Sequence, residues 1–353
     1  LGLGFGVALS PTNLLVAAVG AFLGTVVGVL PGLGPINGVA MLVPIAFAMN
    51  LPPETSLILL AAVYVGAEYG GRITSILLNV PGEAAAVMTT LDGYPLARQG
   101  MASVALSLSA WASFIGSTVA ILGVAAFAPL VAKWALAFGP AEYFVLMVFA
   151  FCALSSLLGD QPVKGVLAAT IGLAIACVGV DANSGVYRYT FDLPELADGI
   201  DFVVVVIGLF AIAEMLQMLE NLLTGQKVEV PPGERKLFNW RELRLTWWTT
   251  VRSALMGFGI GVLPGAGASV ASAVAYANEK RLHEGKDPNA RFGQGDLRGL
   301  AAPEAANNSA ATGSFIPMLT LGVPGSGTTA VMMGALTLYN ITPGPVLFDA
   351  QPA

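Results

Sequence analysis

Long apolar runs are the feature of this sequence that most limits what it can fold into. Nearly uncharged runs cover 101–128, 142–158, 163–180 and 201–224. A helix that spans a bilayer needs about 20 apolar residues, with a range of about 17–25, so each run is long enough to span. Only 11% of the 353 residues are charged, whereas a soluble domain has about 25%. The sequence therefore predicts an all-α polytopic membrane protein, a multi-pass chain embedded in the lipid bilayer.

A broken-helix motif occurs twice. The segment from Gly28 to Gly34 reads GVLPGLG, and the segment from Gly261 to Gly267 reads GVLPGAG. Proline supplies no helical N–H and glycine adopts unusual backbone angles, so each motif interrupts an apolar helix. A second Pro-Gly break at Pro81 has a counterpart 243 residues later. Two breaks in the same order indicate a duplicated, discontinuous-helix transporter.

The duplication sets the expected domain boundaries. We expect a first membrane repeat over 1–225, a cytoplasmic linker over 226–244 and a second repeat over 245–353. The predicted parts of the first repeat are a hairpin over 14–49, a broken helix over 57–91, and the spans 101–128, 142–158, 163–180 and 201–224. Those of the second are a hairpin over 245–277 and a broken segment over 300–341. Because it has no counterpart to the four later spans, we expect the second repeat to be C-terminally incomplete.

Basic residues set the expected orientation. Lys and Arg concentrate in 226–244 and 278–298, and such loops face the cytoplasm. The intervening stretch is too short for two full spans, so it predicts a re-entrant hairpin that enters from the cytoplasm. Counting back through the spans puts 51–56 outside. The first hairpin then enters from the opposite face, and the fold is two inverted repeats with re-entrant helical hairpins and discontinuous helices.

The breaks are the candidate binding site. A helix that begins after a break offers free N–H groups to a carboxylate, and a helix that ends at one offers carbonyl oxygens to Na⁺. The predicted substrate-binding residues are Gly32, Gly34, Asn37, Gly82, Gly265, Gly267, Ser269, Gly325, Ser326 and Thr328. The predicted Na⁺-coordinating residues are Leu33, Asn79, Ala266, Asn307 and Asn308. The competing interpretation is that Pro-Gly merely kinks a helix.

Charged residues inside apolar segments are a second indication of a site. Glu68 and Arg72 are four residues apart and could pair on one helix face, for structure or for function. Glu304 enters a membrane segment together with the two asparagines at 307 and 308, where polar groups are costly. Glu83 follows a break and could cap the helix that begins there.

At 28–35, 261–267, 302–308 and 321–326 the sequence resembles the TctA family, the large membrane subunits of tripartite tricarboxylate transporters. The resemblance implies a secondary-active permease of the bacterial inner (cytoplasmic) membrane that imports small di- or tricarboxylates. It implies two protein partners, a small membrane subunit and a periplasmic solute-binding protein. It also implies symport with a cation, for which we favour Na⁺ over H⁺.

Other function classes are disfavoured by the sequence. Neither glycine cluster is followed by the Lys-Ser/Thr of a phosphate-binding loop, so a gradient rather than ATP is expected to drive transport, by an elevator-like motion. The sequence has no stripe of basic residues of the kind that predicts nucleic-acid binding. We expect no cofactor besides the coupling ion and no enzymatic activity. A passive anion channel, and less so an intramembrane enzyme, stay open as alternatives.

Overall fold

The structure, a computed structural model, is a bundle of helices. It describes residues 2–135, 162–181, 184–200 and 237–344, together with a few single positions outside these ranges. Within the described residues, three helical stretches are long and apolar enough to cross a membrane: Pro11–Val29, Pro53–Leu78 and Ala84–Ala126. Helix content and apolar helices of this length agree with the predicted all-α membrane protein.

The first group of helices begins with a hairpin. After the short α1 (Gly2–Ala8), α2 (Pro11–Val29) and α3 (Gly34–Ala48) are joined by the first Pro-Gly motif. A single long helix, α4 (Pro53–Leu78), follows and packs along α2. The chain then breaks and resumes in a 3₁₀ turn, η1 (Ala84–Ala86), and α5 (Val87–Leu96). A π-helical turn at 97–101 leads into α6 (Ala102–Ala135), which is longer than the predicted span.

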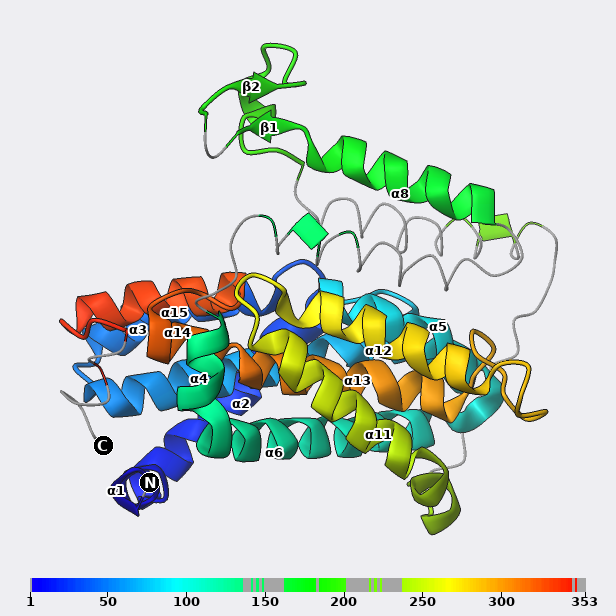
Figure 1. The fold of residues 1–353 in the computed structure, drawn as a ribbon, viewed down its shortest axis with the longest axis horizontal. Coiled ribbons are helices and arrows are strands. Elements are labelled where there is room, and N and C mark those ends of the chain that lie inside the picture. The colour runs from blue at the N-terminus through cyan, green and yellow to red at the C-terminus, as the bar shows by residue number, and fades with distance from the viewer. Residues whose placement is uncertain are drawn as a thin grey trace.

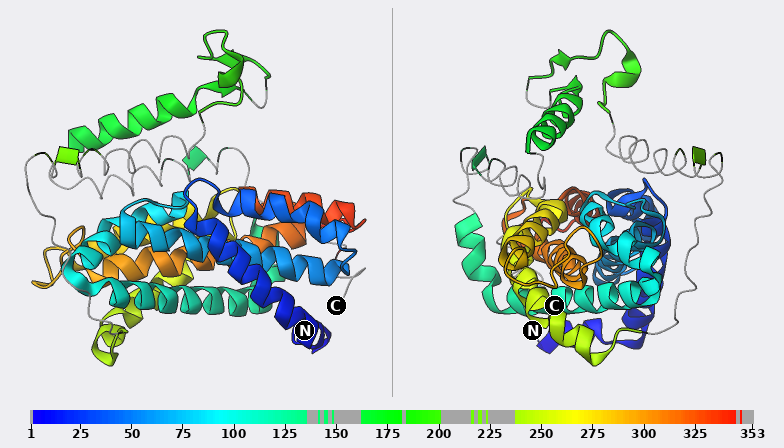
Figure 2. Two further views of the ribbon diagram at one scale, coloured as in Figure 1. Left: turned by 180° about the vertical axis from the view of Figure 1, so that it is seen from behind. Right: turned by 90° about the vertical axis from the view of Figure 1, so that its right-hand side faces the viewer.

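A helix and a small hairpin separate the two groups. The helix is α8 (Pro162–Ala176), and β1 (Gly179–Val180) pairs antiparallel with β2 (Tyr187–Arg188) ahead of a 3₁₀ turn, η3 (Pro194–Leu196). The predicted span 163–180 is therefore helical only to Ala176, because its last two residues form β1. Figures 1 and 2 both draw this segment apart from the bundle. The predicted spans 142–158 and 201–224 lie outside the described ranges.

The second group repeats the arrangement of the first. Its elements are α11 (Trp240–Gly261), α12 (Gly267–His283), α13 (Leu297–Gly313), α14 (Phe315–Leu321) and α15 (Gly327–Leu338). Helix α11 starts inside the predicted linker 226–244, because Asn239 and Glu242 form a capping box that fixes its first turn. The second Pro-Gly motif joins α11 to α12, and α13 packs along both of them. Helix α15 packs instead against α3 of the first group.

The two later breaks have matching backbone geometry. Asn79, which ends α4, is left-handed at φ 56° and ψ 25°, and Gly322, which ends α14, has φ 66° and ψ 27°. The chain then continues without regular secondary structure. The residue before the next helix is extended in both groups: Glu83 in the first (φ −153°, ψ 169°) and Ser326 in the second (φ −154°, ψ 168°). The same turn of backbone is thus built twice from different side chains.

Paired glycines let each hairpin lie directly against a long helix. A Cβ on any of them would come within 2.4 Å of a backbone carbonyl oxygen on the facing helix: Gly24 against Val63, Gly28 against Ala67, Gly257 against Ala306 and Gly261 against Ala310. The partners keep the offset of 243 residues that relates the later breaks, and the glycines keep the offset of 233 that relates the hairpins. Close packing therefore accounts for these glycines.

The two hairpins approach one another from opposite ends of the bundle. In Figure 1 the outer ends of α3 and α15 lie at one end, and the loop between α12 and α13 lies at the other. The left view in Figure 2, from behind, shows the same separation. Each hairpin tip therefore lies in the middle of the bundle, at the depth where the later breaks also occur.

Gly261→Ala tests the close packing of α11 on α13. We expect it to lower the free energy of unfolding by about 1–3 kcal/mol, because its Cβ would meet a carbonyl oxygen at 2.3 Å. Gly259→Ala on the same helix is the matched control, since a Cβ there meets nothing within 4 Å. Thermal unfolding in detergent compares the two. Equal melting temperatures for the two variants would contradict the packing.

Candidate functional site

A cavity of about 470 Å³ lies where the four breaks meet. Both hairpin tips line it, and so do the two segments that follow the later breaks. The residues around it are Gly32, Leu33, Gly34, Pro35, Ile36, Asn37, Tyr64, Glu68, Pro81, Gly82, Glu83, Ala84, Ala85, Gly265, Ala266, Gly267, Ala268, Ser269, Ser326, Gly327 and Thr328. Segments that are far apart in the sequence thus form one chamber.

Helix N-termini are concentrated around this cavity. Helices α3, α12 and α15 and the helical stretch that begins at η1 all start in its wall. Their first backbone N–H groups have no partner within the helix, and the helix dipole adds partial positive charge. The residues before α3, α12 and η1 make no side-chain capping bond, whereas Ser326 caps α15 through Thr329. The wall therefore carries donors that an anion can satisfy.

The tips of the hairpins need glycine. Gly32 and Gly34 have φ of 101° and 60°, and Gly265 and Gly267 have φ of 74° and 67°. Residues with a Cβ rarely adopt these angles. The left-handed turns reverse the chain in a few residues and bring the start of each second helix to the cavity.

The structure brings together most of the residues predicted from the sequence. Those that line the cavity are Gly32, Leu33, Gly34, Asn37, Gly82, Gly265, Ala266, Gly267, Ser269, Ser326 and Thr328. The cavity lining does not include Gly325, Asn79, Asn307 or Asn308. Gly325 packs on Ser314, Asn79 ends α4, and the Asn308 amide donates to the backbone oxygen of Glu304. Asn307 contacts the cavity wall through its hydrogen bond to Glu83.

The two groups exchange matching hydrogen bonds across the cavity. The Tyr64 hydroxyl on α4 lies 3.1 Å from the Ser326 hydroxyl, which follows the break in the second group. The Asn307 amide on α13 donates at 3.2 Å to the Glu83 carboxyl, which follows the break in the first. Helix α4 of the first group therefore hydrogen-bonds to the break of the second, and α13 of the second to the break of the first. The sequence interpretation did not include Tyr64, although the repeat offset that relates it to Asn307 could have found it.

Two carboxyl groups line the cavity. Glu68 is 3% exposed and Glu83 is 8% exposed, and none of the residues around the cavity is Lys or Arg. The expectation that Glu83 caps the following helix is wrong, because its side chain makes no capping bond. Its carboxyl turns instead toward Asn307.

An ion pair lies buried beside the cavity. The Arg72 guanidinium is 2.5 Å from the Glu304 carboxylate, and both side chains are 1% exposed. The Thr89 hydroxyl also donates to Glu304. Arg72 meets Glu68 only at its backbone oxygen, at 3.1 Å. The pairing of Glu68 with Arg72 that their spacing suggested is thus replaced by a bond between α4 and α13.

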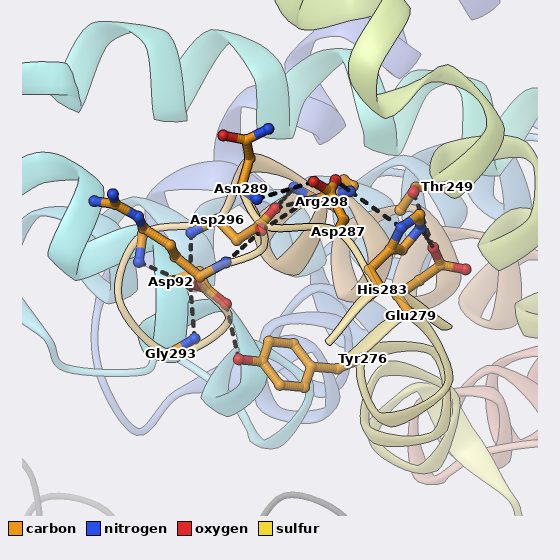
Figure 3. Close-up of polar contacts among 12 residues, drawn as sticks. Asp92, Thr249, Tyr276, Glu279, His283, Asp287, Asn289, Gly293, Asp296 and Arg298 are labelled. Atoms are coloured by element: carbon orange, nitrogen blue, oxygen red, sulfur yellow. Dashed lines mark hydrogen bonds and ion pairs between the residues drawn. The ribbon is translucent and has the colours of Figure 1, made fainter. Parts of the chain in front are cut away.

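A polar network outside the cavity ties the first group to the loop between α12 and α13 (Figure 3). One Asp92 oxygen accepts the backbone N–H groups of Gly293, Gly295 and Asp296 at 2.7–2.9 Å, and the other accepts the Tyr276 hydroxyl at 2.8 Å. One side chain of α5 thus organises the loop. Nothing in the sequence around Asp92 indicated this role.

The same loop is closed by Arg298, which pairs with Asp287 at 2.7 Å and with Asp296 at 3.0 Å. The Asn289 backbone N–H and the Arg298 guanidinium hold the pKa of Asp287 below its ordinary value. Its contribution to stability is therefore complete above the ordinary pKa of aspartate, and is lost as pH falls through the lowered pKa of the folded state.

Glu304→Gln tests the buried ion pair. It leaves the Arg72 charge buried without its partner, so we expect the free energy of unfolding to fall by about 3–5 kcal/mol. Arg188→Gln is the control, because that side chain is 45% exposed and pairs with Asp181 at the surface, where a pair contributes about 0–1 kcal/mol. Thermal unfolding measures both. Similar small losses in the two variants would contradict a buried, stabilising pair.

Asp92→Ala tests the loop network. It removes the acceptor of three backbone N–H groups, so we expect faster hydrogen exchange at Gly293, Gly295 and Asp296. Mass spectrometry of exchanged peptides measures this. Asp287→Ala is the comparison, because it releases the Asn289 amide and not these three. Unchanged exchange over 293–296 in Asp92→Ala would show that the loop is held by other contacts.

A family model and one relative match this chain over nearly its whole length, and a second relative matches about a quarter of it. The family model described as "Tripartite tricarboxylate transporter TctA family" matches residues 14–353. An "Uncharacterized 52.8 kDa protein in TAR-I ttuC' 3'region" of Agrobacterium vitis is 42% identical over 353 residues, which is all of this chain and 69% of that protein. An "Uncharacterized protein in TAR-II ttuC' 3'region" of the same organism is 51% identical over 94 residues, 27% of this chain and 38% of that protein. No solved structure matches.

Proposed function

This chain belongs to the tripartite tricarboxylate transporter TctA family, and we propose that it is the large permease subunit of a binding-protein-dependent secondary transporter. Its substrates are small di- or tricarboxylates, which it imports across the bacterial inner membrane. A cation gradient drives uptake, with Na⁺ favoured over H⁺. The apolar helices and the family place the chain in a membrane as a tricarboxylate transporter subunit.

The observation that carries the proposal is the convergence of helix N-termini on one cavity. A carboxylate needs hydrogen-bond donors and positive potential, and free N–H groups at helix starts supply both without a basic side chain. Discontinuous helices at the middle of a membrane bundle are the usual site of an anionic substrate in secondary transporters. The volume of the cavity suits a small carboxylate rather than a polymer.

The partners follow from the family. Its description is that of a tripartite system, which supports a small membrane subunit and a periplasmic solute-binding protein as companions of this chain. The binding protein would deliver the carboxylate to the outer mouth of the cavity. Specificity among carboxylates then depends on that protein as well as on the cavity.

The transport cycle we propose is alternating access by an elevator-like motion of two inverted repeats. The approach of the hairpins from opposite ends of the bundle supports the inversion. Structures of two access states test the motion: an elevator moves the four breaks together relative to the rest, whereas rocking leaves them in place.

Uptake by proteoliposomes tests the function. With the binding protein, the small subunit and a Na⁺ gradient present, we expect labelled citrate or succinate to accumulate above its outside concentration. A passive anion channel equilibrates the label and cannot accumulate it. Equilibration alone would overturn the transporter proposal. Accumulation that survives collapse of the Na⁺ gradient but not of the proton gradient would assign the coupling to H⁺.

Gly267→Val tests the role of the hairpin tip. Valine disfavours the φ of 67° at this position, so the start of α12 should shift and uptake should be lost while membrane insertion is kept. Gly285→Val is the matched control: its φ is 75°, and a Cβ at either position meets nothing within 4 Å, but it lies outside the cavity. Both are assayed for uptake. Normal uptake by Gly267→Val would reduce the motif to a packing feature.

A further inference from the structure

Two acidic side chains of the first group meet at the wall of the cavity. Glu68 comes from the middle of α4 and Glu83 from the end of the break that follows it. Their carboxyl groups lie within hydrogen-bonding reach of each other. The break folds back so closely that a Cβ on Gly71 would be 2.9 Å from Cγ of Glu83. The close approach of two buried acids is thus built into the repeated backbone turn.

Two acceptor atoms of this cluster have no donor. Among the described residues, Oε2 of Glu68 and Oδ1 of Asn307 are buried and have no hydrogen-bond partner. The Asn307 amide nitrogen donates to Glu83 and also lies within reach of Glu68. The nearby Arg72 pairs with Glu304, and its Nε makes no hydrogen bond. A buried carboxyl group is stable only when a counter-charge or a proton neutralises it. The rest of the cavity wall supplies no positively charged side chain to this cluster.

We infer that Glu68 and Glu83 hold the coupling Na⁺ ion at the wall of the cavity, with Asn307 positioning Glu83. The inference rests on the proposed carboxylate transport and names the cation site of the same cavity. Oxygen donors suit a hard cation. Among the described residues no group of three or more His, Cys, Asp or Glu forms a metal site, and a monovalent ion requires fewer anionic ligands.

This arrangement explains how cation and substrate binding are coupled. A carboxylate at the helix N-termini shares the cavity with the two acids, which repel it when they are unneutralised. Bound Na⁺ removes that repulsion, so each ligand strengthens the binding of the other by the same factor. The Na⁺ ion and the carboxylate substrate need not be in direct contact for this coupling. The two carboxyl groups replace the Na⁺ ligands expected from the sequence, with Asn307 kept as the residue that positions Glu83. Those expected ligands are Leu33, Asn79, Ala266, Asn307 and Asn308.

Na⁺-dependent thermal stability of the purified full chain tests the site. NaCl is titrated against choline chloride at constant ionic strength, each variant being compared with its own Na⁺-free state. We expect the wild type to melt higher with Na⁺. Glu68→Gln and Glu83→Gln should each raise the half-saturating Na⁺ concentration at least about tenfold, the effect of losing a charged ligand.

Glu54→Gln is the matched control, because Glu54 lies exposed in the first turn of the same helix, α4, and should keep the wild-type response. If a glutamine variant does not fold, Glu68→Asp and Glu83→Asp replace it: they retain the carboxylate, and the inference expects a weakened Na⁺ response. Half-saturation within about twofold of wild type in all site variants would overturn the inference. A wild type whose stability follows pH and not Na⁺ would also overturn it.

The citrate assay separates this inference from the proposed function. Citrate accumulation with no Na⁺ response in the melting experiment would leave the transporter standing and remove the Na⁺ site. A Na⁺ response that is lost in Glu68→Gln, in a protein that does not accumulate any carboxylate, would support the site and overturn the function.

Discussion

Interrupted helices inside a membrane impose the constraint on which this structure depends. A backbone N–H or carbonyl group freed from a helix in the bilayer interior must be covered by protein or face a polar cavity. The chain meets this requirement by placing all four interruptions together. Glycine pairs press each hairpin against a long helix, so the freed groups face one another across a single chamber and not the surrounding lipid. The proposed binding site and the means of tolerating broken helices are the same feature.

Buried charged side chains form two neighbouring pairs that have different roles. Arg72 and Glu304 neutralise each other where α4 and α13 meet, and both are fully buried. Glu68 and Glu83 have no basic partner in the cavity wall, and Oε2 of Glu68 has no hydrogen-bond partner. The first pair stabilises contact between the two groups, and the second leaves a place for a mobile cation. Their separation depends on Arg72 pointing away from the carboxyl group one turn earlier on its own helix.

Much of this arrangement could be predicted from the sequence because it depends on residues with strong local preferences. Proline and glycine interrupt a helix whatever surrounds them, so they reveal the breaks at Pro31, Pro81, Pro264 and Pro324. The repetition of these breaks indicated that all four belong to one site. Partners brought together by tertiary packing could not be predicted this way. Arg72 lies four residues from Glu68 but pairs with Glu304, and a helix spacing cannot reveal a partner on another helix.

The polar partners show a further limit. Tyr64 looks like an ordinary residue of an apolar helix, and only its place in the repeat relates it to Asn307. Asp92 organises a loop about 200 residues later in the chain, a contact for which local sequence carries no signal. Helix α11 begins earlier than its composition suggested because a capping box outweighs the polar character of its first turn. Local sequence patterns predict the helices and their breaks. The contacts between these helices depend on long-range hydrogen bonds, which local sequence does not reveal.

Protection of a cysteine in the cavity by carboxylate tests the central claim most directly. Ser269→Cys, at the exposed start of α12, is labelled by an anionic thiol reagent in a background whose native cysteines are replaced by serine. Citrate with Na⁺ should slow this labelling, and leave unchanged the labelling of Ser184→Cys, which lies outside the cavity. Labelling of Ser269→Cys at the same rate with and without citrate would contradict a carboxylate site at the helix N-termini.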